Sequence, residues 1–127
     1  MTTLRTTHER GADGEGIAAR FLEDHGFRIL ERNFRIRRGE VDIIAVRGEI
    51  LAFCEVKAWR SLPMESLEHA ISRDKRRRIV TTAAYYLRRN QEFRNHQTRF
   101  DVLYIPVGGA RTDVCHIEGA FDGDDGW

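Results

Sequence analysis

The segment Gly39–Arg60 constrains the fold of this chain most strongly, because charged residues interrupt two apolar runs joined by a short connection. Side chains alternate in character over Val41–Ala45 and again over Leu51–Lys57, and a period of two over such short runs predicts β-strands. Gly48 lies in the connection, where a positive φ angle suits glycine. The segment is therefore predicted to form a two-stranded hairpin.

Three charged residues lie inside these predicted strands. The alternation places Val41 and Ile43 on one face of the first strand and Asp42 on the other. Glu55 and Lys57 are two positions apart, so they project from the same face of the second strand. Buried charges are unfavourable unless they are paired or bind a metal. The hairpin therefore predicts either a metal site or a structural ion pair between Lys57 and Asp42, with Glu55 solvated at a sheet edge.

The metal-site hypothesis depends on the strand register. If Asp42 and Glu55 lie side by side, their oxygens form a hard-ligand pocket of the kind that Mg²⁺ prefers, with the Val56 carbonyl as a further ligand. Lys57 would hold or deprotonate an attacking water, or neutralise charge at a phosphorus atom. Such a site would hydrolyse phosphodiesters with Mg²⁺ or Mn²⁺.

A helix is predicted from about Gly14 to His25, with Gly26 as its stop signal. Glu15 lies in its first turn, where a carboxylate favours the helix dipole. Glu15 also shares one side of the helix with Ala18 and Leu22, so it could instead point inward and supply a third acid to the hairpin.

The remaining pattern predicts a mixed sheet with helices packed on its faces, in the order α-β-β-β-α-β-β. Ser72 is a good N-cap for a helix reaching about Arg89. Asp101 is expected on the face opposite Phe100 and Val102, paired with Arg99 or a helix residue. Further strands are predicted over Phe27–Ile36, Arg99–Pro106 and Thr112–Ile117, and a helical turn over Glu65–Ile71.

Positive charge is concentrated in the middle of the chain. Residues 28–99 contain 17 Lys and Arg against 9 Asp and Glu, although the whole chain has a net charge of only +1. Such a patch suits a polyanion such as DNA, or it is an ordinary set of solvated side chains. The candidate phosphate-binding residues are Arg37, Arg38, Arg60, Arg73, Lys75, Arg76 and Arg77.

Length and composition favour one soluble domain. The 127 residues suffice for one hydrophobic core, expected over residues 14–120 with a flexible tail at 1–13 and an acidic tail at 121–127. Two cysteines make no disulfide framework, and neither a secretory signal nor a membrane-spanning run is recognisable. A cytoplasmic location is expected.

Asp42 followed by Glu55-Val56-Lys57 on successive strands, after an acidic helix, resembles the PD-(D/E)xK nuclease superfamily. The chain is especially similar to the small bacterial proteins of the YraN family, and the pattern is also similar to archaeal Holliday-junction resolvases. The resemblance covers about residues 14–120. Its motifs are Gly-Glu-x-x-Ala from Gly14, Glu-Arg-Asn-Phe-Arg from Glu31, Gly-Glu-Val-Asp-Ile-Ile-Ala from Gly39, Phe-Cys-Glu-Val-Lys from Phe53 and Arg-Phe-Asp-Val from Arg99.

The resemblance implies a restriction-endonuclease-like α/β fold. It also implies that Glu15, Asp42 and Glu55 are metal ligands and that Lys57 is the catalytic lysine. Val41 precedes Asp42 where the superfamily motif has proline, which leaves the carboxylate in place. We therefore expect a metal-dependent DNA endonuclease, with branched or flapped substrates and a homodimer as further expectations. The alternatives are a non-catalytic nucleic-acid-binding or adaptor module and a hydrolase of a small phosphorylated substrate.

Overall fold

The computed structural model describes residues 7–59, 71–106 and 113–123, with side chains from Gly14 in the first helix and up to Ala58 in the third strand. The predicted helical turn over Glu65–Ile71 lies outside the described residues except for Ile71, which is buried. The elements, in chain order, are α1 (Thr7–Asp24), β1 (Arg28–Ile36), β2 (Gly39–Arg47), β3 (Ile50–Trp59), α2 (Arg73–Arg89), a short 3-10 helix η2 (Gln91–Phe93), β4 (Gln97–Pro106) and β5 (Cys115–Phe121).

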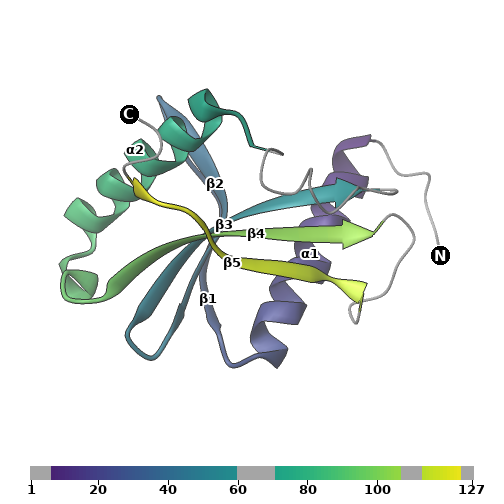
Figure 1. Ribbon diagram of the computed structural model, residues 1–127, viewed down its shortest axis with the longest axis horizontal. Coiled ribbons are helices and arrows are strands. Elements are labelled where there is room, and N and C mark those ends of the chain that lie inside the picture. The colour runs from purple at the N-terminus through teal and green to yellow at the C-terminus, as the bar shows by residue number, and fades with distance from the viewer. Residues whose placement is uncertain (1–6, 60–70, 107–112, 124–127) are drawn as a thin grey trace.

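The five strands form one mixed sheet in the spatial order β1-β2-β3-β4-β5. Among the described strands only β3 and β4 pair in parallel, and α2 lies in the chain segment that connects them. The other neighbouring strands pair antiparallel. Helices α1 and α2 cover opposite faces of the sheet (Figure 1). The predicted mixed sheet flanked by helices, and its element order, are therefore confirmed.

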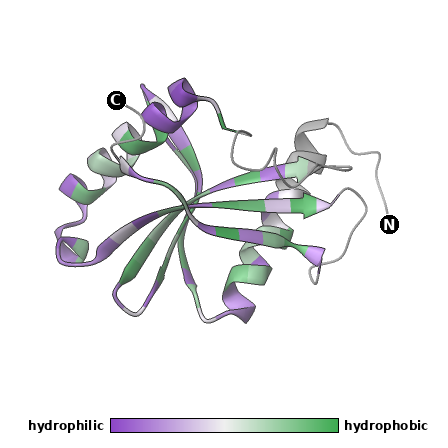
Figure 2. Cartoon of the chain, viewed as in Figure 1, coloured by the Kyte–Doolittle hydropathy of each residue, from purple (hydrophilic) through white to green (hydrophobic). Residues whose placement is uncertain are grey.

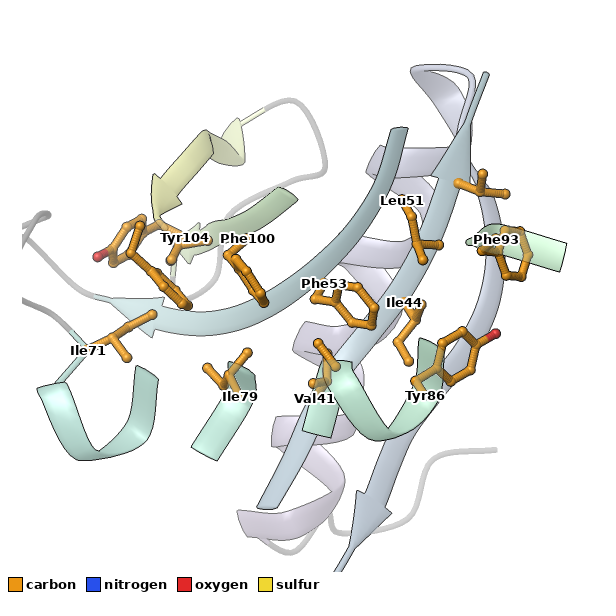
Figure 3. Packing of buried hydrophobic residues seen from close by; sticks show 14 residues of the cluster. Val41, Ile44, Leu51, Phe53, Ile71, Ile79, Tyr86, Phe93, Phe100 and Tyr104 are labelled. Atoms are coloured by element: carbon orange, nitrogen blue, oxygen red, sulfur yellow. The ribbon is translucent and has the colours of Figure 1, made fainter. Parts of the chain in front are cut away.

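Each face of the sheet buries its own hydrophobic cluster. Ala18 and Leu22 of α1 pack over Ala45 and Cys54, whereas α2 covers a larger cluster on the other face. Figure 3 shows this second cluster, in which side chains of the central strands point toward the helix. Its labelled members are Val41, Ile44, Leu51, Phe53, Ile71, Ile79, Tyr86, Phe93, Phe100 and Tyr104.

Helix boundaries follow local chemistry in most places. Ser72 Oγ accepts a hydrogen bond of 3.1 Å from the Lys75 backbone N–H, which confirms the predicted N-cap of α2. Gly26 (φ +89°) ends α1, and the Phe27 N–H returns to the Leu22 carbonyl at 3.0 Å. Gly48 (φ +57°) turns the chain between β2 and β3, as predicted.

The start of α1 differs from the prediction. The helix begins at Thr7 rather than near Gly14, so the part of the expected N-terminal tail from Thr7 onward is helical. Glycine lowers helix propensity by only about 1 kcal/mol, so Gly11, Gly14 and Gly16 do not stop a helix that continues on both sides of them.

Two strand predictions also require correction. The expected alternation of β2 holds for Ile43, Ile44 and Ala45 but is wrong for Val41, which packs with the α2-side cluster while Ile43 packs with the α1-side cluster. A central strand is buried on both faces, so its apolar pattern does not distinguish them. The last strand is predicted over Thr112–Ile117, of which Thr112 lies outside the described residues, and it is observed over Cys115–Phe121. It continues past Ile117 through Gly119 (φ +59°), which lies next to a register shift in the pairing with β4.

Candidate active site

The site begins where β2 and β3 stop pairing. Regular pairing of the two strands runs from Ile43 opposite Cys54 to the hairpin turn, and Asp42 and Glu55 lie just beyond its open end. The Val56 backbone N–H donates a hydrogen bond of 2.8 Å to Asp42 Oδ2. This bond fixes the Asp42 carboxylate against β3 at the position next to Glu55.

Both carboxylates are removed from solvent, with 9% of Asp42 and 3% of Glu55 exposed. Together with Glu15 of α1 they line a cavity of about 270 Å³. Lys57 of β3 and Lys75 of α2 line the same cavity. Glu15, Asp42, Glu55 and Lys57, which the sequence singled out from three separate elements, are thus brought together in one place.

The contacts of Glu55 contradict the alternative in which Lys57 pairs with Asp42 and Glu55 is solvated. Glu55 is buried rather than solvated at a sheet edge, and it pairs with two lysines through the same oxygen. Glu55 Oε2 lies 2.7 Å from Lys75 Nζ and 3.6 Å from Lys57 Nζ. The structural pair expected between Lys57 and Asp42 is replaced by these two contacts of Glu55.

Burial and neighbouring acids perturb the pKa of Asp42. Burial, the nearby charge of Glu55 and a hydrogen bond with Glu55, together with a weaker effect of Glu15, raise the pKa of Asp42 to about 7, and the hydrogen bond from the Val56 N–H offsets part of this rise. Burial alone would lower the pKa of Lys75, but its hydrogen bond to Glu55 and the charges of Glu55, Asp42 and Glu40 raise it. Asp42 and Glu55 therefore compete for charge neutralisation, as closely spaced carboxylates do.

The donor atoms suit a hard divalent cation. Glu15 Oε1 and Glu55 Oε1 are buried without a hydrogen-bond partner among the described residues. Buried carboxylate oxygens without a partner are energetically unfavourable, and Mg²⁺ takes such oxygens as ligands. Within the described part of the chain, however, no three carboxylate, imidazole or thiol groups already converge as a preformed metal site. Val56 and Lys75 instead determine how Asp42 and Glu55 are oriented.

The predicted phosphate-binding residues divide into two groups. Lys75 lines the cavity, whereas Arg73 and Arg77 lie exposed on α2 and Arg76 is half-buried beside them. Figure 2 shows the hydrophilic character of these first turns of α2. Arg37 and Arg38 are exposed at the turn between β1 and β2, and Arg60 lies outside the described residues.

The turn between β1 and β2 lies close to the backbone of α2, and the lack of a side chain at Gly39 permits this contact. A Cβ atom at Gly39 would lie 2.9 Å from the Arg78 carbonyl oxygen and 2.7 Å from Thr82 Oγ1. The turn that carries Arg37 and Arg38 therefore packs directly against the basic part of α2. The sequence contains Gly39 in a family motif, but only the structure shows why a side chain does not fit there.

We predicted from the sequence that Lys75 contacts a phosphate backbone, but we did not predict its ion pair with Glu55. The available signal was its position three residues after the Ser72 N-cap, in the first helical turn, where positive charge is unfavourable. A buried or half-buried acid nearby is the usual compensation. The identity of that acid required the docking of α2 on the sheet.

A second, larger hollow lies elsewhere on the molecule. Its volume is about 700 Å³, and residues around the β2–β3 turn and the end of α2, including Arg47, Gly48 and Asn90, line it. None of the predicted site residues is part of it. The smaller cavity contains Asp42, whose pKa is raised, together with Glu15 and Glu55, so we identify it as the candidate active site.

No helix among the described residues combines the length and apolar character needed to cross a membrane.

Comparison with known proteins yields one family. Residues 14–105 match the model of "Uncharacterised protein family UPF0102". A UPF0102 protein of Myxococcus xanthus is 40% identical over 114 residues, covering 90% of both chains. A UPF0102 protein of Rhodococcus opacus is 41% identical, and the match covers 87% of this chain and 94% of that protein. A UPF0102 protein of Persephonella marina is 38% identical, and the match covers 91% of this chain and 95% of that protein. The chain therefore belongs to UPF0102, the YraN family that its motifs resemble.

Proposed function

We propose that this protein is a metal-dependent endonuclease that hydrolyses phosphodiester bonds in DNA. The observation that carries the proposal is the meeting of Glu15, Asp42 and Glu55 with Lys57 in one cavity, supplied by α1, β2 and β3. Oxygen ligands and an amine at one site are the groups that hydrolytic attack on a phosphodiester requires.

Glu15, Asp42 and Glu55 would hold Mg²⁺ or Mn²⁺, with the Val56 carbonyl as a further oxygen donor. When bound, the cation supplies Lewis-acid polarisation of the phosphate and neutralises developing charge. Lys57 lies on the same face of β3 as Glu55, so its amine would orient the attacking water or accept its proton. The buried position of Asp42 and Glu55 excludes bulk water and strengthens these electrostatic effects.

The basic residues around the cavity support a nucleic acid as the substrate. Arg37 and Arg38 from one turn, and Arg73, Arg76 and Arg77 from α2, would bind phosphates without reading sequence. Arg60, which lies outside the described residues, stays a phosphate-binding residue predicted from the sequence. Branched or flapped DNA is the substrate we favour, and a homodimer formed through an edge strand would present two cavities to its two strands.

The proposal is tested by cleavage of labelled single-stranded, duplex, flap and four-way-junction DNA with Mg²⁺, Mn²⁺ or EDTA, for wild type and Lys57→Ala. We expect cutting that requires the metal and is strongly reduced in Lys57→Ala. Binding measured in parallel separates the alternative. Salt-sensitive DNA binding that persists in EDTA and in Lys57→Ala, with no cutting of any substrate by wild type, would instead identify a nucleic-acid-binding or adaptor module.

A further inference from the structure

We propose that Lys75 is a displaceable cation: its ammonium neutralises Glu55 until a divalent cation enters the cavity, and it then turns to the substrate phosphate. This inference rests on the proposed function, because it concerns how the same cavity is loaded. It assigns Lys75 a role distinct from that of Lys57, although both lysines contact Glu55.

The two lysines share one oxygen and leave the other without a partner. Lys75 Nζ and Lys57 Nζ both approach Glu55 Oε2, at 2.7 Å and 3.6 Å, while Glu55 Oε1 is buried with no hydrogen-bond partner among the described residues. Lys75 thus makes the shorter contact. Any cation that takes both oxygens of Glu55 has to compete with Lys75 first.

Lys75 is built to move without disturbing the fold. Its side chain is 35% exposed, and its backbone is held independently by the Ser72 cap. Lys57 is similarly exposed, at 32%, but its ammonium makes the longer contact with Glu55 Oε2, at 3.6 Å. The flexible stem of Lys75 allows the ammonium to reach solvent while the first turn of α2 stays in place.

The charges around Lys75 favour its movement away from Glu55 once a divalent cation is bound. Lys75 lies in the first turn of α2, where the helix dipole repels positive charge, so the carboxylates of the cavity hold it there. A divalent cation at those carboxylates would weaken this attraction and repel the ammonium at short range. The exposed Arg73 and Arg77 belong to the same first turns of α2, where a DNA phosphate would be bound.

Loading of the metal would then be coupled to binding of the substrate. Before loading, Lys75 shields the acids, and a phosphate group finds one fewer cation. After loading, the freed ammonium contacts the phosphate next to the scissile bond. The metal is therefore expected to increase DNA affinity through Lys75 as well as by its own charge.

The test measures Mn²⁺ affinity by isothermal titration calorimetry at fixed pH and ionic strength, without DNA. Lys75→Met and Lys75→Gln keep an unbranched stem one atom shorter than that of lysine and remove the charge, and we expect each to bind Mn²⁺ about tenfold more tightly than wild type. Arg73→Met is the matched control, because Arg73 is an exposed cation in the same turn that does not line the cavity. Its Mn²⁺ affinity should stay within about twofold of wild type.

A second readout uses DNA binding with Ca²⁺ or EDTA. Ca²⁺ should increase the DNA affinity of wild type by a larger factor than that of Lys75→Met. Unchanged Mn²⁺ affinity in both Lys75 variants would overturn the inference, and weaker affinity would overturn it by showing that Lys75 positions Glu55 for the metal.

The outcomes also separate this inference from the proposed function. If wild type cleaves DNA with Mg²⁺ but the Lys75 variants bind Mn²⁺ no more tightly, only the displacement is wrong. If these variants bind Mn²⁺ more tightly and wild type cleaves nothing, displacement stands and the nuclease proposal fails. If neither wild type nor the variants bind Mn²⁺, both are wrong.

Discussion

The backbone N–H of Val56 donates a 2.8 Å hydrogen bond to Oδ2 of Asp42 and holds this acid beside Glu55. The bond replaces a regular strand pairing at the point where β2 and β3 separate. It stabilises charge on Asp42, whereas burial and Glu55 oppose that charge and raise the pKa of Asp42 to about 7. The fold therefore keeps two acids closer together than is favourable without a cation.

Asp42→Asn should stabilise the metal-free protein at pH 8. The folded pKa of Asp42 lies above its unfolded value of 3.8, so its contribution to stability is complete below pH 3.8 and is lost as the pH rises through about 7. Asparagine keeps the acceptor for the Val56 N–H and removes the charge. In EDTA, chemical unfolding should show a free energy of unfolding about 1–2 kcal/mol above wild type at pH 8, with little difference at pH 4.

Asp74→Asn is the control for this prediction, because Asp74 is an exposed acid in α2 that forms a surface ion pair with Arg77. It should change stability by less than about 1 kcal/mol at either pH. Mg²⁺ should raise the melting temperature of wild type more than that of Asp42→Asn. Equal stability of wild type and Asp42→Asn at pH 8 would show that Asp42 is not under electrostatic strain.

Asp101 of β4 forms a buried network of hydrogen bonds, and replacing it should destabilise the fold. Its fully buried carboxylate accepts two hydrogen bonds of 2.9 Å from Arg99, one of 3.0 Å from the Gly119 N–H, and lies 2.8 Å from His116 Nε2. Asp101→Asn should lower the free energy of unfolding by about 3 kcal/mol, because it removes the buried counter-charge of the largely buried Arg99 and leaves the exposed Glu118, 3.7 Å away, as its acidic partner. Removing the exposed Arg35–Glu40 pair with Arg35→Gln should change it by less than about 1 kcal/mol.

Asp101 also predicts a pH dependence of the opposite sign to that of Asp42. Burial alone would raise the pKa of Asp101, but the hydrogen bonds from His116, Arg99 and Gly119 lower it. A lowered folded pKa contributes stability above the unfolded value of 3.8, and this contribution is lost as the pH falls through the folded pKa. Acid unfolding of wild type should therefore be steeper than that of Asp101→Asn, and parallel curves would contradict this assignment.

The sequence predicted the elements of this fold better than their faces. Ser72 as a cap, Gly26 as a stop and Gly48 as a turn are local signals, and the structure confirms all three. The face of Val41 could not be predicted, because an apolar residue near the start of β2 suits either helix. Local patterns specify backbone geometry, while sides of a buried strand depend on packing.

The candidate site shows the same division. Glu15, Asp42, Glu55 and Lys57 were recognisable as charges inside apolar patterns and as family motifs, and they do line one cavity. The bond of Lys75 to Glu55 depends on how α2 docks across the sheet, which no spacing in the sequence reveals. The contact of Gly39 with Arg78 has the same origin.

Gly39→Ala should loosen that docking. The added methyl group would lie within 3 Å of the Arg78 carbonyl oxygen and of Thr82 Oγ1, and Thr82 itself donates a 2.8 Å hydrogen bond to the same carbonyl. Because a backbone atom has to shift, we expect a loss of about 1–3 kcal/mol in the free energy of unfolding.

Gly16→Ala is the control for the same measurement, and it should change the free energy of unfolding in the opposite direction. Its new methyl group would meet only the end of the Arg32 side chain at 3.9 Å, so the higher helix propensity of alanine should add about 0.5–1 kcal/mol. A Gly39→Ala protein as stable as wild type would mean that the turn and α2 are not packed as described.

The measurement that tests the central claim most directly is the single-turnover rate of DNA cleavage with Mg²⁺ by wild type, Glu55→Gln and Glu49→Gln. Glu49 is an exposed acid at the β2–β3 turn, outside the cavity. Glu49→Gln therefore makes the same change from glutamate to glutamine at a position away from the proposed site. We expect Glu49→Gln to cut like wild type and Glu55→Gln to lose at least about 100-fold in rate. Equal rates for all three proteins, or no cutting by wild type on any substrate, would contradict the assignment of this cavity as a nuclease active site.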